Sequence, residues 1–422
     1  MSKLGLRVLG AVLLMGAAAN AAETGKAKAL AFTTTSTEAR ARVVEALGKI
    51  ENFEPAARVK DLAKQAVAAD PDFAFAQYLL GSATQPAADA KPILDKAVTL
   101  AKNASPGEQR YLEAGMLNRS RKSQEAAAIL VRLHADLPED RTVAMLLGQV
   151  QLNLGQLEPA KTAFERAIAL DATSARAYAL LGNVHLLLGD YGMARQLFET
   201  ARSKKAKEAA PGAVFYGIAF SHLYEGHPDL ALASLATFLE EYRRSGGSPG
   251  LPEVFIWNSM ARINLENGRL EEALTHYEKG FERVPGADIS EQDKQIWLGR
   301  LHHGRGRTLS RMGKHEDAQK EAETLKKMID QGGEASRRFV PAYHYLAGYL
   351  KLEAGDFKAA IEHLTQSNDA DPDPFRKLLL ARAYEKAGDK ASARKVYQEI
   401  VDSKENNIER ALAYPEAKRK LG

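Results

Sequence analysis

Small and aromatic residues recur along this chain at an interval of 34 positions, and no other feature limits the fold as strongly. The matched residues are Gly148 with Gly182, Gly155 with Gly189, Ala160 with Ala194, Phe164 with Phe198, and Ala167 with Ala201. Five identities at one offset indicate an internal repeat. A chain of 422 residues would otherwise suggest about three globular domains, but the repeat predicts one long array.

The residue types within one unit predict two helices that pack closely together. Gly182 and Ala194 are small enough to let two helix backbones approach, and Phe198 is large enough to fill the space beside them. Gly189 can end the first helix in the left-handed conformation. Alanine, leucine, glutamate, lysine and arginine dominate the composition, which favours helices throughout. The chain is therefore predicted to be all-α.

This arrangement resembles the tetratricopeptide-repeat family, whose motif runs from an aromatic residue to Leu-Gly, Ala, Phe and Pro. One unit fills the motif with Tyr178, Leu181, Gly182, Ala194, Phe198 and Ala201, and another with Trp257, Ala261, Ala273, Tyr277, Gly280 and Pro285. The resemblance covers nearly all of the chain. It implies an α-solenoid, a right-handed superhelix of about ten helix-turn-helix repeats with a C-terminal capping helix.

The repeat frame predicts where each unit begins. The ten starts lie near Ser36, Asp72, Gly107, Arg141, Ala175, Gly212, Val254, Gly299, Pro341 and Pro374. The resulting division is a signal peptide (1–21), an N-terminal linker (22–35), repeats one to six (36–245), a flexible connector (246–253), repeats seven to ten (254–407) and a capping helix (408–422). The connector is either a hinge between two arms or a local loop on a continuous superhelix. Ser290 is predicted to start a lengthened helix in the eighth unit.

The first residues have the three parts of a secretory signal. Lys3 and Arg7 supply positive charge, residues 8–19 form an apolar run, and small residues precede a predicted cleavage site before Ala22. We therefore expect a periplasmic or secreted protein with no membrane span after cleavage. An uncleaved anchor is the alternative, although the run is shorter than the ~20 residues that cross a bilayer.

Charge and composition argue against several classes of function. A net charge of +4 provides no field suited to a nucleic-acid backbone, so no nucleic-acid partner is expected. The absence of cysteine excludes disulfides and thiolate metal sites. No catalytic motif is present, and we expect no catalytic residues, no cofactor and no metal site. His185 and His222 occupy equivalent positions in neighbouring units, where they are either close together or separately packed.

The family resemblance implies that the concave surface, lined by the first helix of each unit, binds the partner. The residues carried over to that surface are Arg176, Asn183, Tyr216, Phe220, Phe255, Asn258, Arg262, Arg300, His303, Arg307, Tyr345, Tyr349 and Arg382. Arginine and tyrosine suit a protein or peptide that carries acidic groups or a free C-terminus. Asn183 matches an asparagine with which some family members hold a carboxylate, although Ala179 replaces the accompanying lysine.

Two alternatives remain open at this point. The arginines of the concave surface could instead pair with Glu266, Glu353 or Glu385 of the same array. We expect a non-catalytic scaffold that binds a protein or peptide. The alternative is a structural or assembly component of a cell-envelope machine for secretion, pili or polysaccharide export, which rests on analogy with exported family members.

Overall fold

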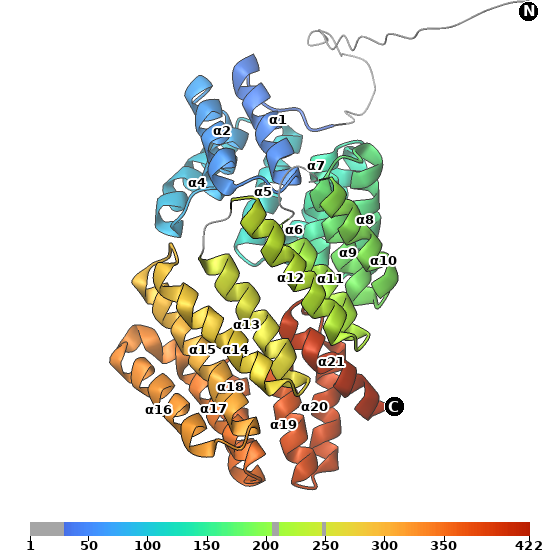
Figure 1. The fold of residues 1–422 in the computed structure, drawn as a ribbon. Coiled ribbons are helices and arrows are strands. Elements are labelled where there is room, and N and C mark those ends of the chain that lie inside the picture. The colour runs from blue at the N-terminus through green and yellow to red at the C-terminus, as the bar shows by residue number, and fades with distance from the viewer. Residues whose placement is uncertain (1–28, 205–210, 247–249) are drawn as a thin grey trace, which may run out of the picture.

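The computed structural model describes residues 29–204, 211–246 and 250–422, and within these ranges it contains twenty-one α-helices and no strand (Figure 1). The predicted signal peptide and its cleavage site lie outside the described residues. The first six helix pairs are α1 (Thr37–Glu51) and α2 (Ala56–Ala69), α3 (Ala74–Ser82) and α4 (Ala87–Ala101), α5 (Pro106–Arg119) and α6 (Ser123–Asp136), α7 (Arg141–Asn153) and α8 (Leu157–Leu170), α9 (Ala175–Leu188) and α10 (Tyr191–Ser203), and α11 (Gly212–Tyr224) and α12 (Pro228–Arg244).

Four further pairs and one last helix complete the chain. They are α13 (Leu251–Glu266) and α14 (Leu270–Arg283), α15 (Glu291–Arg311) and α16 (His315–Gln331), α17 (Val340–Glu353) and α18 (Phe357–Ala370), α19 (Pro374–Lys386) and α20 (Lys390–Asp402), and α21 (Ile408–Leu421). Short 3-10 helices, η1 (Val284–Gly286) and η2 (Glu334–Phe339), precede α15 and α17. Each helix packs mainly on its neighbours along the chain, so the prediction of an α-solenoid of ten helix pairs is confirmed.

The unit starts follow the repeat frame to within a few residues, except in the eighth unit. The eighth unit was predicted near Gly299, but α15 begins eight residues earlier, where Ser290 accepts a hydrogen bond from the Asp293 backbone N–H at 3.1 Å. The helix is therefore lengthened at its N-terminus, as the sequence indicated. In the predicted connector 246–253, residues 247–249 lie outside the described range and residues 251–253 already belong to α13.

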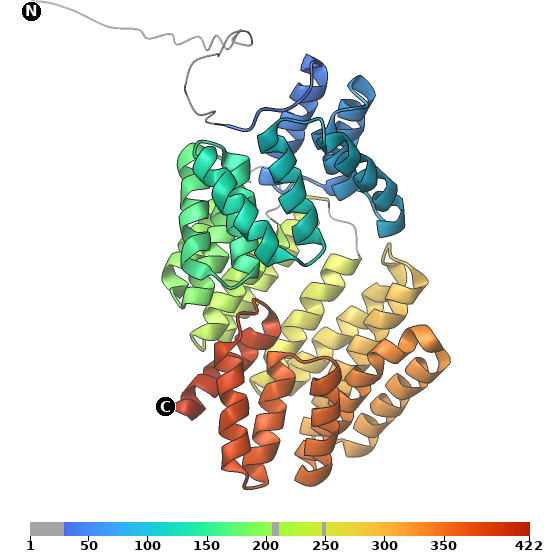
Figure 2. The ribbon, with the colours of Figure 1, turned by 180° about the vertical axis from the view of Figure 1, so that it is seen from behind.

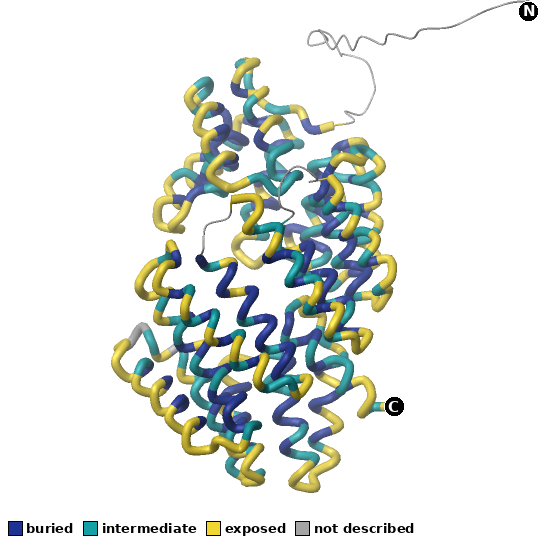
Figure 3. The backbone as a smooth tube through the Cα atoms, viewed as in Figure 1, coloured by how far each residue is buried: buried dark blue, intermediate teal, exposed yellow. Residues whose placement is uncertain are grey.

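The recurring small residues allow the close packing that the sequence predicted. A Cβ atom added to Gly182 would lie 2.9 Å from the ring of Phe198, and one added to Gly148 would lie 2.7 Å from the ring of Phe164. Both rings are fully buried. Glycine is required here because any side chain would overlap the ring that the second helix places beside it. Buried residues accordingly lie along the contact faces of the helices, and exposed residues gather at the turns (Figure 3).

The segment before α1 packs on the first four units. The backbone N–H of Leu30 donates to the Asp140 carboxylate at 2.7 Å, and that of Thr33 donates to the Glu108 carboxylate at 2.6 Å. The ring of Phe32 lies 4.8 Å from that of Phe75. Residues 30–35 of the predicted linker are thus part of the packed structure.

The last helix does more than cover the end of the array. α21 packs on α19 and α20, and it also reaches α11 and α13 across the inside of the superhelix (Figures 1 and 2). Ile408 and Ala411 belong to the same buried cluster as residues of α9 to α13. A second contact between distant units joins α1 to α9. The expected capping helix therefore also links units that are far apart in sequence.

Candidate functional site

A pocket of about 1250 Å³ lies on the inner side of the superhelix. Its walls come mainly from the first helices of successive units, α11, α13, α15 and α17, with the start of α19. Residues 406–409, at the start of α21, form the facing wall. Single drug-sized ligands usually occupy ~300–1,000 Å³, so this pocket is large enough for an extended segment of a larger molecule.

Most of the residues predicted for the partner-binding surface line this one pocket. They are Asn183, Tyr216, Phe220, Phe255, Asn258, Arg262, Arg300, His303, Arg307 and Tyr345. All ten lie on the first helices of successive units, α9, α11, α13, α15 and α17.

The three remaining predicted residues lie elsewhere. Arg176 donates a hydrogen bond to the Gln149 side chain at 2.9 Å and does not line the pocket. Tyr349 is buried in the core cluster that contains Phe375. Arg382 is covered by α21, to which it is bound through Glu416. The structure therefore places these three outside the candidate site.

One wall of the pocket is a row of aromatic rings. The ring of Tyr216 lies 5.8 Å from that of Phe220 and 5.2 Å from that of Phe255, and Phe255 lies 5.8 Å from Trp297. Phe255 is 41% exposed, which is unusual for phenylalanine and makes its face available to a ligand. Burial raises the pKa of Tyr216, so this wall is uncharged near neutral pH.

Three of the arginines in the pocket are neutralised by carboxylates of the chain itself. Arg262 forms an ion pair with Glu409 of α21. Arg307 is 2% exposed, lies 3.5 Å from a carboxylate oxygen of Glu266, and donates to the Tyr345 hydroxyl at 3.1 Å.

The third of these arginines, Arg376, lies at the start of α19. It is 2.7 Å from an Asp371 oxygen and 2.8 Å from an Asp373 oxygen. Of the predicted arginines, Arg262 and Arg307 are paired internally, but only Arg307 pairs with a glutamate that the alternative named, Glu266.

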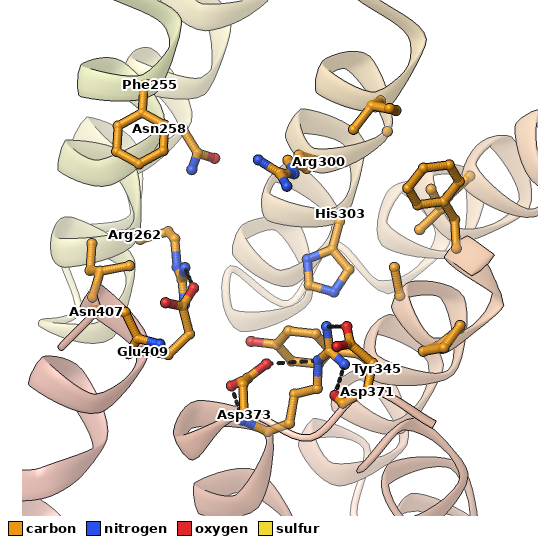
Figure 4. Close-up of a pocket in the computed structure, with 18 of the residues that line it drawn as sticks. Phe255, Asn258, Arg262, Arg300, His303, Tyr345, Asp371, Asp373, Asn407 and Glu409 are labelled. Carbon is orange, nitrogen blue, oxygen red and sulfur yellow. Dashed lines mark hydrogen bonds and ion pairs between the residues drawn. The ribbon is translucent and has the colours of Figure 1, made fainter. Parts of the chain in front are cut away.

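Arg300 differs from Arg262, Arg307 and Arg376 because its side chain forms no ion pair or hydrogen bond within the described chain. Its guanidinium lies 4.8 Å from the ring of Trp297. Partial burial lowers the pKa of Arg300, and the nearby Arg262 acts in the same direction, but a guanidinium remains charged in proteins. Figure 4 shows it between Asn258 and His303, directed into the pocket. Arg300 is therefore available to an anionic group of a ligand.

His303 offers a neutral polar group beside Arg300. The side chain is 8% exposed, its ring lies 4.3 Å from that of Tyr345, and its buried Nε2 has no hydrogen-bond partner. Burial, followed by the charges of Arg307, Arg376 and Arg262, lowers the pKa of His303 well below its usual value. A neutral imidazole has one donor and one acceptor nitrogen, so His303 can recognise a polar group such as a peptide amide.

The balance of charge in the pocket favours an anionic ligand. Five arginines and three carboxylates line it, so the lining side chains carry a net positive charge.

Sequence reasoning did not find the contribution of α21 to the pocket. A usable signal was present, because Glu409 and Glu416 are seven residues apart and therefore lie on one face of a helix.

Among the described residues no three His, Cys, Asp or Glu side chains are arranged to hold an ion. His185 Nδ1 lies 3.3 Å from an Asp190 carboxylate oxygen, whereas His222 Nδ1 is buried without a partner. Sequence spacing missed one close pair, His344 and His363, whose Nδ1 atoms lie 2.9 Å apart across α17 and α18.

The fold and the pocket together define an α-solenoid of stacked helix pairs that carries its candidate binding site on the inner surface. Models of the tetratricopeptide repeat match residues 117–184 and 351–413, residues 216–288, and residues 175–200. The chain belongs to the tetratricopeptide-repeat family.

The solved structures that this chain resembles include three proteins, two of them described as tetratricopeptide-repeat proteins. Yeast Tom70 is 12% identical, with 92% of this chain and 89% of that chain covered and a TM-score of 0.45. A tetratricopeptide repeat protein from Parabacteroides merdae is 13% identical, with 82% and 98% covered and a TM-score of 0.36. YrrB, described as having an unusual peptide-binding site, is 20% identical, with 49% and 94% covered and a TM-score of 0.32. A search of curated proteins found no match.

Proposed function

We propose that this protein is a non-catalytic scaffold that binds a segment of a partner protein or peptide in the pocket between α11 and α19. The observation that carries the proposal is Arg300, a cation without a partner that points into a pocket lined by aromatic rings and polar side chains. Arg300 is exposed to solvent and has no carboxylate partner within the described chain, so a ligand carboxylate can form charge-assisted hydrogen bonds with it without displacing an internal partner.

The pocket indicates which chemical groups the partner carries. A carboxylate, either from an acidic side chain or from a free C-terminus, fits Arg300. An apolar or aromatic side chain fits against Phe255, whose face is exposed. Peptide amides fit the polar side chains of Asn258 and His303, because both can donate and accept hydrogen bonds. The partner is therefore a peptide segment with an acidic group close to an apolar one.

We also propose that the protein is exported. The support comes from residues 1–21 alone, which have the charge, apolar run and small residues of a secretory signal. No helix in the described part of the chain is both long and apolar enough to cross a membrane. Mass spectrometry of protein recovered from the periplasm or medium should find Ala22 at the N-terminus. Recovery of uncleaved protein from the membrane fraction would contradict this proposal.

Binding is tested by a substitution that removes the positive charge of Arg300. Peptides that combine Asp or Glu with Phe or Tyr are compared with their Asn and Gln counterparts by fluorescence anisotropy. A hydrogen bond to a charged group contributes ~1.5–3 kcal/mol, so Arg300→Gln should weaken binding of the acidic peptides by about tenfold or more. Arg262 and Arg307 are unsuitable for this test because each is already paired inside the chain.

The matched control is Arg305→Gln on the same helix. Arg305 is paired with Glu321 at 3.2 Å and does not line the pocket, so its loss removes the same charge outside the site. If both variants bind acidic peptides as the unmodified chain does, or if acidic and neutral peptides bind equally, the pocket is not the proposed site.

A further inference from the structure

The helix α21 is held in the structure by an unusual set of contacts. The second helices of the repeats are anchored by large buried rings and aliphatic side chains, such as Phe198 in α10 and Tyr277 in α14. In α21 the fully buried apolar side chains are those of Ala411, Ala413 and Ala417, and the largest buried aliphatic side chain is Ile408, at 9% exposed. The larger apolar side chains Leu412, Tyr414 and Leu421 pack against the neighbouring cores but are only partly buried, so α21 is held less by fully buried large side chains than the second helices of the repeats are.

The main specific contacts of α21 are electrostatic. Glu409 forms an ion pair with Arg262 of α13, and Glu416 accepts two hydrogen bonds from Arg382 of α19 at 2.9 and 2.6 Å. Arg410 donates to the Tyr224 hydroxyl of α11 at 3.0 Å. The two carboxylates thus bind arginines on two different helices, which fixes the position of α21 across the inner face.

Helix α21 also has a low intrinsic tendency to remain helical. Pro415 lies in its interior, where proline removes one backbone hydrogen bond and clashes with the preceding turn. Residues 403–407, which connect it to α20, are not helical. A helix of fourteen residues that contains proline is not stable alone in water. It is therefore helical because it is docked.

The surface beneath α21 is continuous with the candidate pocket. Arg262 lines the pocket and also binds Glu409. Arg300 lines the pocket on the next helix and is not paired by α21 (Figure 4). A partner that offered a carboxylate to Arg262 could therefore also reach Arg300, which α21 leaves unpaired.

We propose that the inner face covered by α21, which we call the α21 seat (Arg262, Arg382 and Tyr224), is an interaction surface for an acidic helix of the partner. This inference rests on the proposed function and specifies the form of the partner. The partner's carboxylates replace Glu409 and Glu416 at Arg262 and Arg382, and α21 is displaced while residues 403–407 keep it attached. Each arginine exchanges one carboxylate for another, so no buried charge is left unpaired.

The chain itself supplies the probe for a test. A fluorescent peptide with the sequence of residues 405–421 is added to the full chain and to the full-length variant Glu409→Gln/Glu416→Gln, which we call the seat variant because it removes both carboxylates that α21 places in the seat. The unmodified chain should bind it weakly, because the attached helix competes at an effective concentration of about 1 mM. The variant, whose own helix is weakened, should bind the peptide at least tenfold more tightly than the unmodified chain does.

Two matched controls isolate the carboxylates. The variant Glu271→Gln/Glu278→Gln changes two exposed glutamates seven residues apart on α14, and it should bind the peptide as weakly as the unmodified chain. A peptide that carries glutamine at the positions of Glu409 and Glu416 should bind at least tenfold more weakly to the seat variant. If the two peptides bind equally, or if neither binds to the folded seat variant, the α21 seat does not exchange its occupant.

Hydrogen exchange on the unmodified chain provides a second measurement if the seat variant does not fold. If α21 leaves its seat while the repeats stay folded, its amides open to solvent more often than those of the neighbouring helix. Amides of α21 should then exchange at least tenfold faster than those of α20. Equal exchange in α20 and α21 would show that α21 is a fixed element. Arg300 is not part of the seat. The peptide test of the pocket can therefore fail while the test of the α21 seat succeeds, and the test of the seat can fail while that of the pocket succeeds.

Discussion

Replacing Gly304 with alanine tests whether close approach of helices determines the fold. Gly304 lies in α15, and a Cβ atom added there would lie 2.2 Å from two ring carbons of Tyr277 in α14 and 2.6 Å from its hydroxyl oxygen. Favourable carbon contacts are ~3.5–4.0 Å, so the ring would have to move by more than about 1 Å. Tyr277 is 0% exposed, which leaves it no solvent to move into.

The expected change in stability is the difference of two opposing effects. Overpacking a buried site costs ~1–3 kcal/mol, and the three overlapping ring atoms place Gly304→Ala near the upper value. Alanine favours the helix over glycine by ~1 kcal/mol. The net loss is therefore about 2 kcal/mol. Gly48→Ala in α1 is the matched control, because no atom lies within 4 Å of the added Cβ and only the gain of ~1 kcal/mol remains.

Hydrogen exchange under native conditions measures the result helix by helix, which suits an array whose units differ in stability. A loss of about 2 kcal/mol corresponds to roughly thirtyfold faster exchange of the most protected amides in α14 and α15. Gly48→Ala should slow exchange in α1. If Gly304→Ala left exchange in α14 and α15 unchanged or slower, the argument that small residues are needed for the helices to approach would be refuted.

Three further changes give distinct outcomes. Phe32→Ala should release residues 30–35 at a cost of about 2 kcal/mol, because the ring is half-buried against Phe75, and limited proteolysis should then cut this segment faster. His303→Gln should flatten the pH dependence of the urea midpoint between about pH 7.5 and 5.5. The pKa of His303 is lowered in the folded chain, so the unfolded chain binds the proton first and stability is lost as pH falls below ~6.5. Glu253→Gln should reduce stability near neutral pH, because Arg243 and Arg283 lower the pKa of Glu253 in the folded chain. The unmodified chain should lose this contribution to stability as the pH falls below ~4.5, and the variant should not. Acid titration followed by circular dichroism measures the difference.

The repeat frame could be predicted because its cause is local. Gly189 adopts a φ of +84° where the sequence placed the end of a helix, and Ser290 caps α15 as its position before an acidic turn indicated. Such features depend on residues a few positions apart, so one sequence is enough to find them. The start of the eighth unit was less accurate, since the family pattern does not fix how far a helix extends before its first packing residue.

The pocket-lining positions were predicted where helix geometry alone decides which way a side chain points. Asn258 and Arg262 are four residues apart on α13 and both line the pocket, as this spacing requires. Arg382 and Tyr349 were misplaced for a different reason. Arg382 is covered by Glu416 of α21, and Tyr349 is packed in the core with Phe375. These contacts depend on where distant helices pack in three dimensions, which no local spacing encodes.

The contact between α21 and α11 has a consequence for how this protein can change in length. In an open solenoid each unit touches only its neighbours, so units can be gained or lost without disturbing the rest. Here Arg410 binds Tyr224 across 186 positions of sequence. Deleting or duplicating a helix pair between α11 and α21 would shift the two partners out of register. Homologues that keep this contact should therefore have the same number of units after α11, whereas extension is unrestricted where no such contact exists.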